Sequence, residues 1–137
     1  MLGPTGSVVD ASALLAYLLG EPGSAAIRAA LAAGAAMSIV NYAEVLTRLG
    51  DSGDDPASTH RRLTEQGLFG GLLDVVSLTD DDVVTMARLR NPTRAQSLSL
   101  GDRACLATGL RLGWPVVTVD RNWAAVHVGV VVQLIGP

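Results

Sequence analysis

The sequence predicts an α/β domain of three layers, α/β/α, with a central, mainly parallel sheet of five strands. Strand-length apolar runs alternate with helical patterns along the chain. The residues are 49% hydrophobic but only 4% aromatic, so the core must be built from Ala, Leu and Val, as in parallel sheets covered by helices. At 137 residues the chain is long enough for one domain with a substantial core, and it shows no repeat.

Glycines separate the elements expected in the first half of the chain. Residues 1–6 are rich in Gly and Pro and are expected to form a flexible end before a single domain of residues 7–137. Gly20 and Gly34 each follow a helical pattern, and glycine is common just past the end of a helix. The elements expected here are strands at 7–10 and 35–38 and helices at 11–19, 24–33, 41–49 and 57–66.

Capping residues and further glycines define the second half. A strand is expected at 72–78, after a glycine-rich segment. Thr79 followed by three aspartates is typical of a helix start, and Asn91-Pro92 ends that helix. The remaining elements expected are a helix at 101–112, a strand at 115–119, a helical turn at 122–125 and a strand at 128–134. This alternation favours right-handed crossovers and therefore a parallel sheet with helices on both faces.

The charged residues exclude several classes of function. All ten basic residues are Arg, and the absence of Lys excludes a P-loop, a Schiff-base enzyme and a response-regulator receiver, each of which needs a lysine. The net charge of −3 argues against broad electrostatic adhesion to nucleic acid. A local nucleic-acid site is still compatible with this charge, because arginine is well suited to bidentate phosphate contacts.

The composition also predicts the cellular environment. No apolar stretch approaches the length of a membrane span, and no secretory signal is visible at the N-terminus. The single cysteine, Cys105, cannot form an internal disulfide and lies in a helical pattern, where a core residue is expected. We therefore expect a cytoplasmic protein with no membrane association.

Four carboxylates stand where the chain passes from one element to the next. Asp10 and Asp120 follow two predicted strands, whereas Glu44 and Asp102 lie about one turn into predicted helices. Each acid alone is well explained as part of a helix cap, Glu44 in a capping box with Asn41 and Asp102 in the equivalent arrangement with the serine three residues before it.

The shared position of the four acids favours a metal site over four separate caps. In an open parallel sheet, ligands bind beyond the carboxyl ends of the strands, where all four acids are expected. Clustered carboxylates without a neutralising lysine would repel one another and destabilise the fold unless a cation were present. Hard oxygen ligands suit Mg²⁺ or Mn²⁺, which can activate a water and stabilise charge on a phosphate under attack.

Three polar residues are candidates to support this site. Ser12 could bind a metal-bound water or a phosphate, or could simply cap the helix. Thr118 could orient a carboxylate, or could be an ordinary β-branched strand residue. Asn41 could serve both as helix cap and as a substrate ligand.

Arginines near the third acid, Asp102, are candidates for contacts with phosphate, and Arg103 is the one that follows it directly. The full set is Arg88, Arg90, Arg94 and Arg103. Other notable side chains are expected to be structural: His60, His127 and Arg61-Arg62 at the surface, and Trp114 and Trp123 at the edge of the core.

Four segments of the chain each contain one of the four acids. They are Val8-Val9-Asp10-Ala11-Ser12-Ala13-Leu14-Leu15-Ala16, Ser38-Ile39-Val40-Asn41-Tyr42-Ala43-Glu44-Val45, Leu98-Ser99-Leu100-Gly101-Asp102-Arg103-Ala104-Cys105-Leu106-Ala107 and Val117-Thr118-Val119-Asp120-Arg121-Asn122-Trp123. Together these segments resemble the PIN-domain family, and among its branches the VapC-type toxins of bacterial toxin–antitoxin pairs. The resemblance runs from about residue 8 to residue 135, and the four motifs occur in the family's order and spacing.

The resemblance implies a metal-dependent endoribonuclease in which Asp10, Glu44, Asp102 and Asp120 hold Mg²⁺ or Mn²⁺. It further implies hydrolysis by an activated water without a covalent intermediate, a homodimer, and a VapB-type antitoxin that inserts a segment near the active site. The alternative is a metal-binding PIN domain that acts mainly as a protein-interaction module. A phosphatase of the haloacid dehalogenase type is disfavoured, because Ser12 stands where that chemistry needs a second aspartate and lysine is absent.

Overall fold

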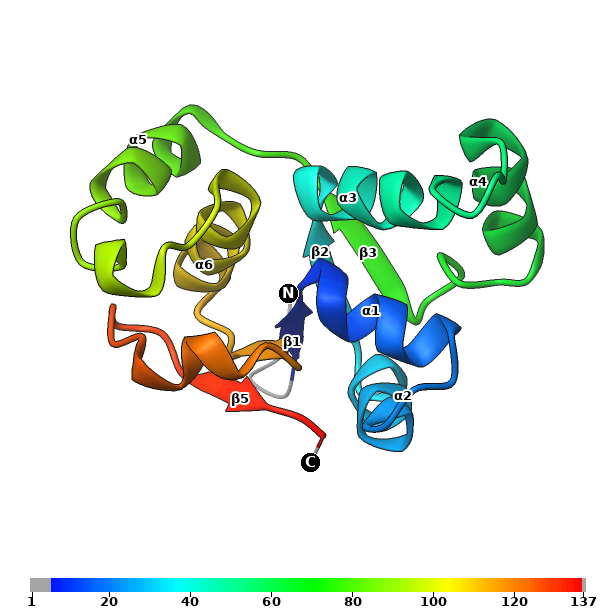
Figure 1. Cartoon of the computed structure of the whole chain (residues 1–137), viewed down its shortest axis with the longest axis horizontal. Helices are drawn as coiled ribbons and strands as arrows, with labels where there is room; N and C mark the ends of the chain where they lie inside the picture. Colours follow the sequence, from blue (N-terminus) through cyan, green and yellow to red (C-terminus); the bar gives the residue numbers. More distant parts are fainter. Residues whose placement is uncertain (1–5, 137) are drawn as a thin grey trace.

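A single parallel sheet forms the centre of the computed structural model, which describes residues 6–136 (Figure 1). The strand order is β3-β2-β1-β4-β5, and every neighbouring pair is parallel, which confirms the predicted sheet. The strands are β1 (Ser7–Val9), β2 (Ala35–Ser38), β3 (Leu73–Val76), β4 (Val116–Thr118) and β5 (Val132–Leu134).

Helices cover both faces of this sheet, so the three-layer prediction is also confirmed. The α-helices are α1 (Ala11–Leu18), α2 (Ser24–Ala32), α3 (Ile39–Gly50), α4 (Pro56–Glu65), α5 (Asp80–Arg88) and α6 (Leu100–Leu112). Two short 3₁₀ helices, η1 (Arg94–Gln96) and η2 (Arg121–Ala125), complete the described elements. Figure 1 shows α1 and α2 on one side of β1, and α6 on the other.

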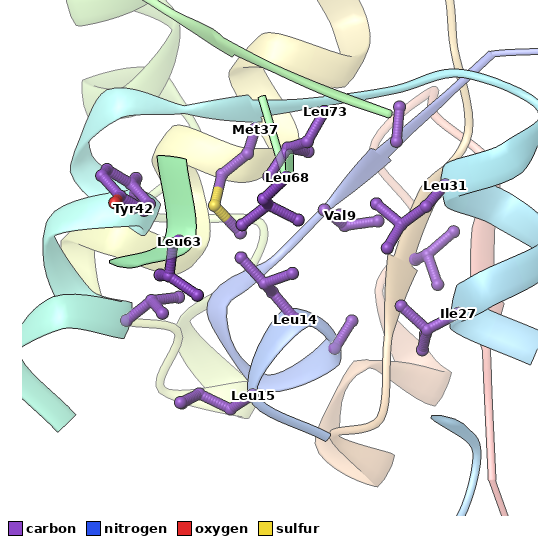
Figure 2. Close-up of a cluster of buried hydrophobic side chains, with 14 residues drawn as sticks. Val9, Leu14, Leu15, Ile27, Leu31, Met37, Tyr42, Leu63, Leu68 and Leu73 are labelled. Carbon is purple, nitrogen blue, oxygen red and sulfur yellow. The ribbon is translucent and has the colours of Figure 1, made fainter. Parts of the chain in front are cut away.

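Alternation of side chains along β1 divides the core in two. Val9 packs with Leu14 of α1 and residues of α2, α3 and α4, a cluster drawn in Figure 2. Val8 points to the opposite face and packs with Leu106 of α6 and with Trp123. Both faces of the sheet are therefore buried where β1 and β4 end side by side.

Several structural expectations for individual residues are confirmed. Cys105 is fully buried, Trp114 and Trp123 lie in the core, and His60 and His127 are exposed. Within residues 6–136 no helix has both the length and the apolar character needed to cross a membrane. Of the N-terminal segment expected to be flexible, residues 1–5 lie outside the described residues, and Gly6 is buried against Trp114.

The element boundaries agree with expectation to within one residue at each end, except in three elements. Strands β3 and β5 are shorter than 72–78 and 128–134, since the pairing of β3 with its neighbour ends at Val76 and that of β5 begins only at Val132. Helix α3 begins at Ile39, directly after β2, and its N-cap is Ser38, whose hydroxyl accepts the Asn41 N–H at 3.1 Å. The expectation that Asn41 caps this helix in a box with Glu44 is therefore wrong.

Candidate active site

The carboxyl ends of β1 and β4 meet at the centre of one sheet edge. Val9 and Val117 are partners in the parallel pairing, so Asp10 emerges directly beside the end of β4. The Asp10 N–H donates to the Val117 carbonyl at 3.1 Å, which fixes the backbone at this point. The predicted convergence of the first and fourth strands is thus present.

Asp10 is buried and surrounded by hydrogen-bond donors. Its side chain is 5% exposed, and Oδ1 accepts the Ala13 N–H at 2.8 Å as the N-cap of α1. The Ser12 hydroxyl lies 2.8 Å from Oδ1 and 3.0 Å from Oδ2, and the Thr118 hydroxyl donates to Oδ2 at 2.5 Å. Burial nevertheless raises the pKa of Asp10 from 3.8 to about 6, and the charge of Asp102 adds to this rise.

Thr118 connects Asp10 to the fourth acid. The Asp120 N–H donates to the Thr118 hydroxyl oxygen at 3.0 Å, while that hydroxyl donates to Asp10. Asp120 in turn caps η2, where Oδ1 accepts the Asn122 N–H at 3.0 Å. Ser12 closes the network, because its hydroxyl oxygen accepts the Val119 N–H at 3.3 Å.

Glu44 is held between α3 and the start of α6. The Asn41 side-chain amide donates to Glu44 Oε1 at 2.8 Å and to the Gly101 carbonyl at 2.9 Å. A Cβ atom added to Gly101 would lie 2.5 Å from Glu44 Oε2, so no larger residue fits at position 101 without moving the carboxylate. Asn41 is itself fixed by the Ser38 hydroxyl, which donates to its Oδ1 at 2.6 Å.

Asp102 is part of a complete capping box, as predicted. Its Oδ2 accepts the Ser99 N–H at 2.9 Å, and its own N–H donates to the Ser99 hydroxyl at 3.1 Å. Cys105 lies one turn further along α6 and is buried. Burial raises the pKa of the Cys105 thiol well above its ordinary value, and the charges of Asp10, Asp102 and Glu44 raise it further.

The chemistry of these acids suits a hard divalent cation. Glu44, Asp102 and Asp120 each have one carboxylate oxygen that accepts no hydrogen bond from residues 6–136. All the available ligand atoms are carboxylate oxygens, the type that Mg²⁺ and Mn²⁺ prefer. Within residues 6–136, however, no three Asp, Glu, His or Cys side chains form a group that could hold a metal ion in their present positions. Binding would require the side chains to move toward a shared ion.

The supporting residues expected from the sequence have different locations. Ser12, Asn41 and Thr118 contact the acids through the hydrogen bonds described above. The Arg103 guanidinium extends instead toward α5, where Nη1 donates to the Met86 carbonyl at 2.9 Å. It lines a cavity of about 320 Å³ together with Arg90 and Arg94, whereas Arg88 does not.

Sequence reasoning missed two residues that position this site. Ser38 anchors the Asn41 side chain, and Gly101 provides the space that Glu44 occupies. A glycine in the first turn of a helix, just before a candidate metal ligand, was a usable signal, because glycine there weakens the helix unless a close approach requires it.

Several solved structures have folds similar to this chain. VapC20 from Mycobacterium tuberculosis, described as a Sarcin-Ricin loop cleaving toxin, has a TM-score of 0.66 at 16% identity, covering 91% of this chain and 98% of that one. FitAcB from Neisseria gonorrhoeae has a TM-score of 0.66 at 20% identity, with coverages of 93% and 96%. VapBC2 from Rickettsia felis, bound to a promoter DNA fragment, has a TM-score of 0.67 at 13% identity, with coverages of 94% and 98%.

The family itself is identified by the sequence rather than by these distant structures. No curated protein matches the chain. A sequence model of the PIN domain matches residues 7–128, which include all four acids and nearly the whole sheet. The chain therefore belongs to the PIN-domain family.

Proposed function

We propose that this PIN domain is a divalent-cation-dependent endoribonuclease and the toxin of a VapBC-type toxin–antitoxin pair. The observation that carries the proposal is the environment of Asp10. This carboxylate is buried at the end of β1, is held by the Ser12 and Thr118 hydroxyls, and has its pKa raised by burial and by the charge of Asp102. Acids so placed in a PIN domain favour cation binding over a purely structural role.

Asp10 and Asp102 are the proposed principal ligands of Mg²⁺ or Mn²⁺, and Glu44 and Asp120 complete the site. Such a cation, when bound, supplies a more acidic water and stabilises negative charge on the phosphate. The chain's own contribution is to orient the acids. Thr118 fixes Asp10, and Asn41 turns Glu44 so that one of its oxygens stays available to orient the attacking water.

The proposed RNA substrate and partners find support in the similar structures. One is described as a toxin that cleaves the Sarcin-Ricin loop, and another as a toxin–antitoxin complex from Klebsiella pneumoniae. We propose by analogy a VapB-type antitoxin as the partner, a homodimeric assembly and a cytoplasmic location. The Klebsiella structure has a TM-score of 0.63 at 18% identity, so the fold is shared while the substrate must be determined for this chain.

Cleavage of structured RNA by the purified protein tests the proposal directly. Wild type with Mg²⁺ or Mn²⁺ is expected to cut the RNA, and Asp10→Asn to lose that activity. Asp54→Asn is a matched control, because Asp54 is exposed in the loop before α4 and makes no described hydrogen bond. Equal cleavage by wild type and Asp10→Asn would contradict the proposal. Cation binding without cleavage would favour the protein-interaction module.

A further inference from the structure

A polar cavity lies between the end of α5, η1 and the start of α6. Three of its lining residues are arginines and none is acidic. It has a volume of about 320 Å³ and is lined by Arg90, Thr93, Arg94, Ser97, Leu98, Ser99, Leu100 and Arg103. In a chain with a net charge of −3, three guanidinium groups around one cavity form a local concentration of positive charge.

Arg103 is the buried arginine of this cavity, and its hydrogen bonding is incomplete. The residue is only 8% exposed, and the one described hydrogen bond of its side chain is from Nη1 to the Met86 carbonyl. The Nε atom is buried without a partner. No carboxylate of residues 6–136 forms an ion pair with it, since the ion pair found there joins Arg111 to Asp82. A buried cation without a counter-charge is costly unless an anion completes its surroundings.

The two exposed arginines of the cavity also carry positive charge that no carboxylate of residues 6–136 neutralises through an ion pair. Arg94 uses one nitrogen on the Asn91 side chain at 2.8 Å, a neutral partner that leaves its charge unbalanced. The Arg90 side chain makes no hydrogen bond or ion pair with the residues that the structure describes. Phosphate suits such a set better than a carboxylate does, because its several oxygens can accept from more than one guanidinium fork.

Ser99 connects the cavity to the acids. It lines the cavity and also forms the reciprocal hydrogen bonds with Asp102 that begin α6. Asp102 and Arg103 are consecutive residues, so the helix directs one toward the acids and the other toward α5. We infer that the cavity binds a backbone phosphate of the RNA next to the one that is cleaved, an inference that rests on the proposed function for its substrate class.

Binding of RNA without cleavage tests this inference. The full chain is titrated into a short fluorescein-labelled single-stranded RNA in EDTA, and anisotropy is recorded at several salt concentrations. Arg90→Gln/Arg94→Gln is expected to weaken binding by about 10-fold or more and to lower the salt slope by about one for each phosphate that is no longer neutralised. The matched control, Arg61→Gln/Arg62→Gln, removes two exposed arginines of α4 and is expected to bind like wild type.

A conservative change at the buried position gives a second readout. Arg103→Lys keeps the charge but loses the planar fork, so several-fold weaker RNA binding is expected from protein that still unfolds cooperatively. If this variant does not fold, the exposed pair Arg90 and Arg94 still decides the question. Both variants are compared with wild type for a rise in melting temperature caused by inorganic phosphate.

The outcomes separate this inference from the proposed function. The inference would be overturned if the Arg90/Arg94 variant had the RNA affinity and the salt slope of wild type. That conclusion would hold even if free phosphate stabilised the protein, or if the variant bound an acidic protein partner more weakly. In that case wild-type cleavage would leave the proposed function intact. Loss of RNA binding in the variant, with no cleavage by any form, would support the phosphate site and contradict the nuclease.

Discussion

Thr118 Oγ1 donates a 2.5 Å hydrogen bond to Asp10 Oδ2 and thereby joins the carboxyl ends of β1 and β4. The same oxygen accepts the Asp120 N–H, so one hydroxyl positions two of the four acids. Thr118 is fully buried, and a side chain of the same shape without the hydroxyl would leave both acids less well held.

Thr118→Val is expected to lower cation affinity and RNA cleavage by roughly 10-fold or more, because groups that orient metal ligands typically contribute at this level. The variant loses a donor to Asp10 and an acceptor for Asp120 while keeping its packing volume. Thr118→Ser retains the hydroxyl and is the matched control. Titration calorimetry with Mn²⁺ and a cleavage assay measure the two effects, and equal values for Val and Ser would contradict this role.

The pH dependence of the cation-free protein follows from the raised pKa of Asp10. Its folded-state pKa is about 6 against an ordinary value of 3.8, so the folded state holds this proton more tightly than the unfolded state does. Stability should therefore fall as pH rises between these two values, by on the order of 2–3 kcal/mol. Melting temperatures in EDTA should show this fall in wild type and not in Asp10→Asn; parallel pH profiles would refute it.

Cation binding should have the opposite pH dependence. A cation competes with the proton on Asp10, so affinity for Mn²⁺ is expected to increase as pH rises toward and past about 6 and then to level off. Calorimetric titrations at several pH values in buffers of matched ionic strength measure this. An affinity that does not change across this pH range would show that Asp10 is not a ligand.

Local patterns were enough to predict much of the fold and the capping role of Asp10 and Asp102, while the metal-binding role of the four acids stays a prediction. Val-rich runs between helical segments predicted the parallel sheet, and the Ser99–Asp102 spacing predicted a capping box that the structure confirms. The predicted Asn41 cap failed for a local reason, because Ser38 caps α3 and Asn41 lies inside the helix. The role that its amide plays instead depends on a distant contact, because it donates to Gly101, which only the packing of α3 against α6 brings near.

Gly101→Ala is expected to reduce cleavage by up to about 100-fold by displacing Glu44, because small misplacements of reacting groups are costly. The added Cβ would lie 2.5 Å from Glu44 Oε2. Gly50→Ala, at the end of α3 with its nearest neighbour at 3.9 Å, is the matched control and should be neutral or stabilising by up to about 1 kcal/mol. Full activity of Gly101→Ala would show that Glu44 need not occupy its described position.

Two equivalent capping boxes allow the structural and functional roles of Ser99 to be separated. Ser99 caps α6 and Thr79 caps α5, each through reciprocal bonds with an aspartate three residues later. Replacing either with Ala should cost about 1 kcal/mol of unfolding free energy. Only Ser99→Ala should also impair RNA cleavage, because its partner Asp102 is one of the four candidate site acids. The partner of Thr79 is Asp82, which instead pairs with Arg111. Urea unfolding measures the loss of stability in each variant, and a cleavage assay measures the loss of activity. A similar loss of cleavage in both variants would mean that reduced stability alone explains it.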